Sequence, residues 1–405
     1  MVWWATSARD RPVNRWRPSP TFLLTAYGPT LLASMGIGAI TPLVALTARD
    51  LGSGVGVAAF VVALLGIGQL CGDLPAGVLA DRLGEKRALV LACLLEAASL
   101  AVACVAPDVV VLGAAVFAAG VASSVLGLAR QSYFTVAVPA AYRARALSGL
   151  GGSLRMGFLV GPLVGAGLIA AFDLWAAYAF AALMSLFAGL VTLALPDLPS
   201  TGRPSGPAPR VALREVLWQH RRVLATVGVG SLLIMMVRAS RQSIIPLWAD
   251  SQGVDPAVTS IIFGISGAMD MLMFFPGGWI MDRFGRLWVA APATAVIGVG
   301  MLLLPLTSTV VTIAAVALLM GLGNGISSGV VMTMGSDASP AVGRSQFLSG
   351  WRLFADAGTS LGPLLITLVA GLASLGAASL TVGALALLGT GWLVRWVPRR
   401  RRPAG

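Results

Sequence analysis

The sequence predicts an all-α membrane protein with twelve transmembrane helices, arranged as two parallel repeats of six. Hydrophobic residues make up 57% of the 405 residues and charged residues 11%, against about 45–50% and 25% in soluble domains. The mean hydropathy is +0.87. Apolar runs of about 18–25 residues recur along the chain, and each is long enough to cross the hydrocarbon core as a helix. The runs are continuous rather than alternating, so a β-barrel is not expected.

The chain also contains an internal repeat. A shift of 201 residues aligns residues 66–163 with residues 267–364 without a gap. The coinciding pairs include Gly66 and Gly267, Pro75 and Pro276, Asp81 and Asp282, Gly120 and Gly321, Arg143 and Arg344, and Pro162 and Pro363. The protein is therefore a duplicated unit of roughly 200 residues, and such a repeat fixes the architecture before any local signal.

Six helices are predicted in each copy of the repeat. Their ranges are 21–46, 55–78, 88–106, 109–130, 148–170, 175–195, 223–248, 256–278, 287–305, 310–333, 347–370 and 375–394. An even number of crossings returns the chain to the side where it began. The two repeats are therefore parallel and related by an axis along the membrane normal.

The domain organisation follows from these helices. We expect an N-terminal tail at 1–20, a first bundle at 21–195, a linker at 196–222, a second bundle at 223–394 and a basic tail at 395–405. The first part of the linker is rich in Pro, Gly and Ser and should be flexible. Its second part, VALREVLWQHRR, fits either a short helix on the membrane surface or a plain basic linker.

Charge predicts the orientation in the membrane. Arginines and lysines gather in the tails, the linker and the loops on one side, whereas the other side has Arg49 as its one basic residue. The positive-inside rule then places both termini in the cytoplasm of a multi-pass plasma-membrane protein. The net charge of +12 is spread over these loops, so we expect contact with anionic lipid rather than nucleic acid.

Several classes of site are not expected. Cys71, Cys93 and Cys104 all fall inside predicted helices, and His220 is the only histidine, so we expect no disulfide, metal site or cofactor. No phosphate-binding G-x-x-x-x-G-K-S/T loop is present, so coupling to ATP within this chain is not expected. The loops contain no cluster of acids or histidines that would suit a membrane enzyme.

The loops after helices 2 and 8 carry related motifs. They read P-A-G-V-L-A-D-R-L-G-E-K-R from Pro75 and P-G-G-W-I-M-D-R-F-G-R from Pro276. Both resemble the signature of the major facilitator superfamily, G-x-L-A-D-R-x-G-R-K, although Glu85 and Met281 depart from it. The resemblance covers nearly the whole chain and implies a secondary transporter of twelve helices.

The resemblance also implies a conformational latch in these two loops. In the family, the aspartate of the motif faces the positive N-terminal end of a helix in the other half and helps to hold the cytoplasmic side closed. Asp81 would then face helix 11, and Asp282 would face helix 5. A turn charge that merely aids solubility is the alternative. The latch residues are Gly77, Asp81, Arg82, Gly84, Gly278, Asp282, Arg283 and Gly285.

Helix 5 carries a second motif, formed by Gly157, Gly161, Pro162 and Gly165. It resembles the G-x-x-x-G-P-x-x-G-G motif of the drug and metabolite antiporters of the superfamily, which implies export. Generic packing of small residues is the alternative. Two departures concern proton coupling. Val116 occupies the place where many proton-coupled exporters carry an arginine, and predicted helix 1 contains no acid.

Eight ionisable residues are predicted inside the membrane, where such groups usually face a partner, a cavity or a pathway. They are Asp73, Glu96, Arg155, Arg238, Arg241, Asp270, Arg352 and Asp356. In the superfamily fold helices 5 and 8 meet, and Arg155 and Asp270 have matching depths, so we expect them to pair across the two halves when the cytoplasmic side is closed. Arg352 and Asp356 are one helical turn apart and could pair with each other. Static ion pairs without a role in transport are the alternative.

The remaining four suggest separate roles. Arg238 and Arg241 share a face of helix 7, where they would either meet an anionic or carbonyl-bearing substrate or serve as gate or snorkelling residues. Glu96 is a candidate proton site. Asp73 is near a predicted helix end and could simply be hydrated.

These observations together predict a secondary transporter that exports a drug-like or secondary-metabolite molecule by alternating access, in exchange for protons. Such efflux would confer multidrug resistance. A nutrient or organic-anion uniporter or symporter of the same fold is the alternative. We expect it to act as a monomer whose partners are its small-molecule substrate, protons and membrane lipids.

Overall fold

The computed structural model describes residues 20–138, 142–195, 213–340 and 344–398. This part of the chain contains twelve helices long and apolar enough to cross a membrane, which confirms the predicted fold class. Most of the predicted tails and the first part of the linker fall outside the described residues.

The helices of the first bundle are α1 to α7. Their bounds are α1 Pro20–Ile40, α2 Leu43–Asp50, α3 Val55–Leu83, α4 Glu85–Cys104, α5 Val109–Ala137, α6 Arg143–Ala171 and α7 Leu174–Leu193. The second bundle follows a short helix, α8 Leu213–Gln219. Its helices are α9 Arg221–Val223, a π-helical turn at Leu224–Gly228, α10 Val229–Ser251, α11 Pro256–Phe284, α12 Leu287–Leu303, a 3₁₀ turn at Leu304–Leu306, α13 Val310–Ile326, α14 Val330–Ala338, α15 Arg344–Leu372 and α16 Leu375–Trp396.

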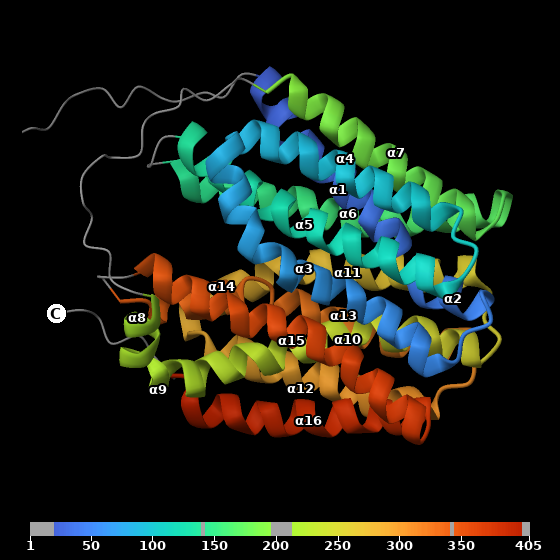
Figure 1. Cartoon of the computed structure of the whole chain (residues 1–405). Coiled ribbons are helices and arrows are strands. Elements are labelled where there is room, and N and C mark those ends of the chain that lie inside the picture. Colours follow the sequence, from blue (N-terminus) through green and yellow to red (C-terminus); the bar gives the residue numbers. More distant parts are fainter. Residues whose placement is uncertain (1–19, 139–141, 196–212, 341–343, 399–405) are drawn as a thin grey trace, which may run out of the picture.

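The two bundles repeat the same packing. In the first, α1 packs on α6, α3 on α5 and α4 on α7; in the second, α10 packs on α15, α11 on α13 and α12 on α16. The bundles meet where α3 packs on α15 and α6 on α11. Figure 1 shows them as two layers, with α3 and α11 between. We call the end at which α1 begins and α16 ends the terminal end, and the end that holds α2 the distal end.

Two of the predicted crossings are interrupted, and several helices run past their predicted ends. The first crossing breaks between α1 and α2, because Pro42 has no N–H to continue the helical ladder. The tenth breaks before α14 at Gly329, whose φ of 79° is left-handed. α3 continues to Leu83, several residues past the predicted end. The glycines that end the two signature motifs, Gly84 and Gly285, have φ of 81° and 104° and so allow the sharp turns into α4 and α12.

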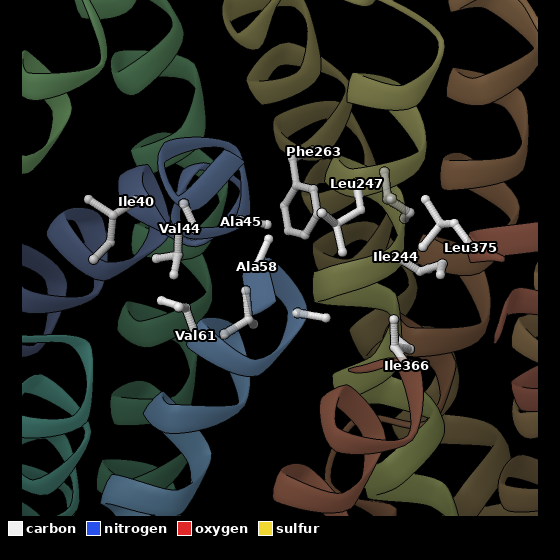
Figure 2. Close-up of a cluster of buried hydrophobic side chains, with 14 of the residues drawn as sticks. Ile40, Val44, Ala45, Ala58, Val61, Ile244, Leu247, Phe263, Ile366 and Leu375 are labelled. Carbon is white, nitrogen blue, oxygen red and sulfur yellow. The ribbon is translucent and has the colours of Figure 1, made fainter. Parts of the chain in front are cut away.

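The buried cores differ between the two ends of the molecule. One core in the distal half is shared by both bundles. Figure 2 shows part of it, where Ala45 and Ala58 of the first bundle lie beside Leu247 and Phe263 of the second. In the terminal half each bundle has a core of its own, one built from residues 26–195 and the other from residues 216–397. The two bundles are therefore joined by apolar packing at the distal end.

The short helix predicted in the linker is present as α8. Val216 is buried against the second bundle, and the ring of His220 lies 5.6 Å from that of Phe347 on α15. Trp218 is 68% exposed, with the Arg221 guanidinium 4.3 Å above its ring. This amphipathic arrangement fastens the end of the linker to the second bundle.

Candidate substrate pathway between the two bundles

A charged pair lies where α6 meets α11. Arg155 Nη1 donates a hydrogen bond to Asp270 Oδ1 at 2.8 Å, and the two side chains are 19% and 18% exposed. The Arg155 guanidinium also lies over the ring of Phe274, 4.5 Å from its centroid. The contact that the matching depths of Arg155 and Asp270 predict for a closed cytoplasmic side is therefore present in this conformation.

Asp270 is held from the second bundle as well. The Asn324 amide donates to Asp270 Oδ2, and the Ser328 hydroxyl lies 3.5 Å from Oδ1. Arg238 Nε in turn donates to Asn324 Oδ1 at 2.7 Å. A continuous chain of polar contacts thus runs from Arg155 through Asp270 and Asn324 to Arg238. Asn324 was not among the residues predicted from the sequence, although a single amide in the small-residue stretch GLGNGISSG indicates a polar contact inside the bundle.

Arg241 is buried beside this chain. Its Nη1 donates to Ser266 Oγ at 2.8 Å, and its guanidinium lies 5.7 Å from the centroid of the Phe263 ring. Its Nε has no hydrogen-bond partner among the described residues. Arg238 and Arg241 are therefore directed at α13 and α11, inside the second bundle.

A second charged group lies where α3 meets α15. Arg352 Nη2 is 3.0 Å from Asp73 Oδ1, and Arg352 Nε is 3.3 Å from Asp356 Oδ2. The pairing of Arg352 with Asp356 was predicted from their spacing. The pairing with Asp73 was not, because Asp73 seemed close to a helix end; α3 in fact continues well beyond it, and Ser124 also donates to its carboxylate. Two carboxylates thus share one guanidinium across the bundle interface.

Glu96 lies away from both interfaces. It is 1% exposed inside the first bundle and accepts hydrogen bonds from Ser123 and Ser185, each at 2.8 Å. Arg130, 8% exposed, is close enough to interact with it electrostatically. Arg130 was not predicted to lie inside the membrane, because the predicted helix ends at that residue, whereas α5 continues to Ala137.

A cavity of about 160 Å³ lies between the bundles, and part of its wall is formed by the shared core. Most of its wall is apolar, and its polar side chains are Thr41, Gln69, Gln242 and Thr359. No charged residue of the described chain lines it, and neither Arg238 nor Arg241 belongs to its wall. Val116, at the position where exporters of the resembled family often carry an arginine, does line it.

The helix 5 motif forms a close contact within the first bundle. A Cβ placed at Gly157 or Gly161 would overlap atoms of Ser34 or Met35 on α1, and one at Gly165 would lie 3.2 Å from the carbonyl oxygen of Ala39. The second bundle repeats this contact, since a Cβ at Gly358 or Gly362 would overlap backbone carbonyls of α10. The glycines therefore let α6 lie directly against α1, with Pro162 inside α6.

The signature-motif residues lie near the terminal ends of α3 and α11. The side chains of Asp81 and Arg82, with Gly77, fall outside the described part of the structure. The Asp282 side chain is 81% exposed and lies 3.8 Å from Arg286, and no ion pair joins it to α6 among the described residues. The latch therefore stays a prediction, for a conformation in which the terminal ends meet.

The distal end carries a further ion pair between the bundles. Arg49 Nε lies 3.2 Å from Asp250 Oδ2, with both side chains 36% exposed, and Arg49 Nη1 donates to the carbonyl oxygen of Ser53 at 2.7 Å. The two positions differ by 201 residues, so they are equivalent in the repeat and pair across its axis. The pair lies on the distal side of the shared apolar core.

The comparison with a family of known proteins agrees with this architecture. A model of the major facilitator superfamily matches residues 29–341, and again residues 227–405. The chain belongs to the major facilitator superfamily. Family and fold are therefore those of transmembrane transporters, and the chain is a multi-pass membrane protein.

Solved transporters share the fold at low sequence identity. A POT family transporter in complex with a thioalcohol-conjugated peptide superposes with a TM-score of 0.78 at 12% identity, over 93% of this chain and 96% of that one. The nucleoside transporter NupG gives a TM-score of 0.75 at 16% identity over 93% and 99%. A D-xylose–proton symporter gives 0.74 at 16% identity over 94% and 98%.

One curated relative is similar over part of the chain. A triacylglyceride transporter of Mycobacteroides abscessus is 25% identical over 157 residues, which cover 36% of this chain and 29% of that protein. The matched segment is thus well under two thirds of the relative's length.

Proposed function

We propose that this superfamily member exports a small, mainly apolar organic molecule of the drug or secondary-metabolite kind, by alternating access and in exchange for protons. The observation that carries the proposal is the position of the cavity. It lies between the two bundles and is walled partly by the buried core that both share, whereas in the terminal half each bundle has a core of its own. With the termini in the cytoplasm, as the positive-inside rule predicts, this conformation faces inward.

Alternating access then requires contacts at the distal end to break and contacts at the terminal end to form. Opening the distal end would separate the shared core and the Arg49–Asp250 pair. Closing the terminal end would bring the signature motifs of α3 and α11 against the first turns of α15 and α6, as the latch prediction states. The two states would be held by different interfaces, so a ligand that binds one state more tightly could shift the balance between them.

Proton coupling is proposed for the group at the α3–α15 interface. Asp73 and Asp356 share the one guanidinium of Arg352 and interact with each other. Two carboxylates with one cation leave one negative charge uncompensated, and binding of a proton would neutralise it. This group lies between the bundles, so its charge state can respond to their separation.

The direction of transport rests on the helix 5 motif, whose glycines make the close α1–α6 contact. A nutrient uniporter or symporter is the second candidate. It is favoured by Val116 in the cavity wall and by the absence of acids from α1. Both features depart from the resembled exporters.

Flux measurements in proteoliposomes test the proposal. A panel of neutral, anionic and cationic compounds would be assayed with a pH gradient in either direction and without one. We expect a neutral compound to move up its own concentration gradient while protons flow down theirs in the opposite direction. Asp356→Asn should abolish the dependence of this flux on the pH gradient. Gradient-independent flux in the unmodified protein would favour the uniporter instead.

A further inference from the structure

Two amide side chains line the cavity between the bundles. Gln69 lies on α3 of the first bundle and Gln242 on α10 of the second, and both line the cavity. Neither amide makes a hydrogen bond to another residue in the part of the chain that the structure describes. The rest of the wall is apolar except for Thr41 and Thr359, whose hydroxyls can bond to carbonyls of their own helices: Thr41 Oγ1 donates to Ile37 O at 2.6 Å and Thr359 Oγ1 to Ala355 O at 3.2 Å.

Both glutamines are partly exposed to this cavity, so a ligand there could take up hydrogen-bonding capacity that no described residue uses. Each glutamine offers two N–H donors and one carbonyl acceptor. We infer that Gln69 and Gln242 recognise the transported molecule, and that it is a neutral compound presenting an amide-like or ester-like group beside an apolar body. This inference rests on the proposed function and specifies its substrate class.

The charges around the cavity support a neutral ligand. The Arg155 and Asp270 charges are paired with each other, and Arg238 and Arg241 are directed away from the cavity wall, toward α13 and α11. A charged ligand would lose its hydration without meeting an opposite charge in the wall, which is strongly unfavourable. An anionic substrate, which the two arginines suggested from the sequence, is therefore not favoured by this cavity.

The volume of the cavity limits the size of the ligand, and the positions of the two glutamines indicate how it would contact the bundles. A dry cavity of about 150 Å³ accommodates one benzene molecule, so about 160 Å³ suits a single ring with a small polar group. Because one amide comes from each bundle, a ligand bonded to both would bridge the bundles. Gln69 and Gln242 would then both bind the ligand and couple its binding to the relative movement of the two bundles.

The test compares four probes of similar size: benzamide, ethylbenzene, benzoate and benzylammonium. The full-length protein in lipid nanodiscs is titrated with each, and affinity is read from the ligand-induced rise in the thermal unfolding midpoint. Benzamide should stabilise most, ethylbenzene less, and the two ions not at all. Equal shifts with benzamide and ethylbenzene, no shift with benzamide, or tighter binding of benzoate would overturn the inference.

Substitutions assign the effect to the two residues. Gln69→Leu and Gln242→Leu should each weaken benzamide binding by about fivefold, the effect of one neutral hydrogen bond, and leave ethylbenzene unchanged. Gln252→Leu is the matched control, because Gln252 is an exposed amide beyond the end of α10. Should a leucine variant unfold early, the ranking of the probes on the unmodified protein tests the same claim.

The outcomes separate recognition from transport. Benzamide binding that depends on both glutamines, in a protein that moves none of the panel compounds, would keep this inference and refute the proposed export. Proton-coupled flux of a neutral compound that is unchanged in the double leucine variant would keep the export and overturn this inference.

Discussion

The two interfaces between the bundles are related by the repeat but differ in charge. Where α6 meets α11, Arg155 and Asp270 form one balanced pair. The shift of 201 residues places Asp356 at the position of Arg155 and Gln69 at the position of Asp270. The α3–α15 interface has instead gained Asp73 and Arg352, and it holds two carboxylates for one guanidinium.

The packing around these charges has remained the same in both copies. Gly161 lets α6 lie on α1, and the equivalent Gly362 lets α15 lie on α10. Close backbone contact tolerates no side chain at such a position, so duplication keeps the glycine. A side chain that faces the other bundle is not constrained in this way and can change its charge. We interpret the balanced pair as a contact that holds the bundles together, and the unbalanced group as the candidate proton site.

The largest expected effect comes from breaking the balanced pair. Asp270→Asn would leave Arg155 without its carboxylate, and Asp270 is also the acid that interacts with Arg238 and Arg241. We expect a loss of about 3 kcal/mol, at the low end for a buried pair because both side chains are partly exposed. Arg155→Gln should cost less, since Asp270 keeps Asn324. Unfolding midpoints would show this order, with Asp282→Asn on the same helix as a stability control. An equal cost for both variants would contradict it.

The second largest loss of stability is expected at the glycine contacts that the two copies of the repeat share. Gly161→Val and Gly362→Val should each destabilise the protein by about 2 kcal/mol through overpacking, because each side chain would meet a backbone carbonyl of the facing helix. Gly167→Val is the matched control on α6, where a Cβ meets nothing within 4 Å. Flux should fall in both variants more than their abundance in the membrane. A large difference between the two would show that the duplicated contacts are no longer equivalent.

At the α3–α15 interface, removal of one carboxylate should change proton coupling more than stability. Asp356→Asn leaves Arg352 paired with Asp73, which converts this group into a balanced pair like that of α6 and α11. We expect a change in stability below about 1 kcal/mol, together with loss of the response of transport to a pH gradient. Flux measured with and without the gradient checks this. A variant that stays fully coupled would remove this group from the proton pathway.

The smallest effect on stability is expected at the distal ion pair. Arg49 and Asp250 are each 36% exposed, so Arg49→Gln should change the unfolding free energy by less than about 1 kcal/mol. It should nevertheless favour opening of the distal end. The measurement is the rate at which a thiol reagent labels Val61→Cys, a position buried in the shared core. An unchanged rate would mean that apolar packing alone keeps this end closed.

The sequence by itself determined the architecture. Composition and the lengths of the apolar runs require membrane-spanning helices, and the gapless repeat requires two similar bundles. It also predicted contacts that depend on spacing within one helix, such as Arg352 with Asp356, and the depth match of Arg155 with Asp270. The spacing and the depth follow from the rise per residue and periodicity of the backbone, whereas the meeting of helices 5 and 8 was implied by the resemblance to the superfamily.

Only the tertiary structure decided which neighbours the buried polar groups meet. A helix face is defined by the sequence, but the helix that covers it is not. Arg238 and Arg241 therefore turned out to contact Asn324 and Ser266 rather than the cavity, while Gln69 and Gln242 line it. Helix ends were also decided in three dimensions: α3 continues past Asp73, whose carboxylate meets Ser124 and Arg352, and α5 continues past the buried Arg130.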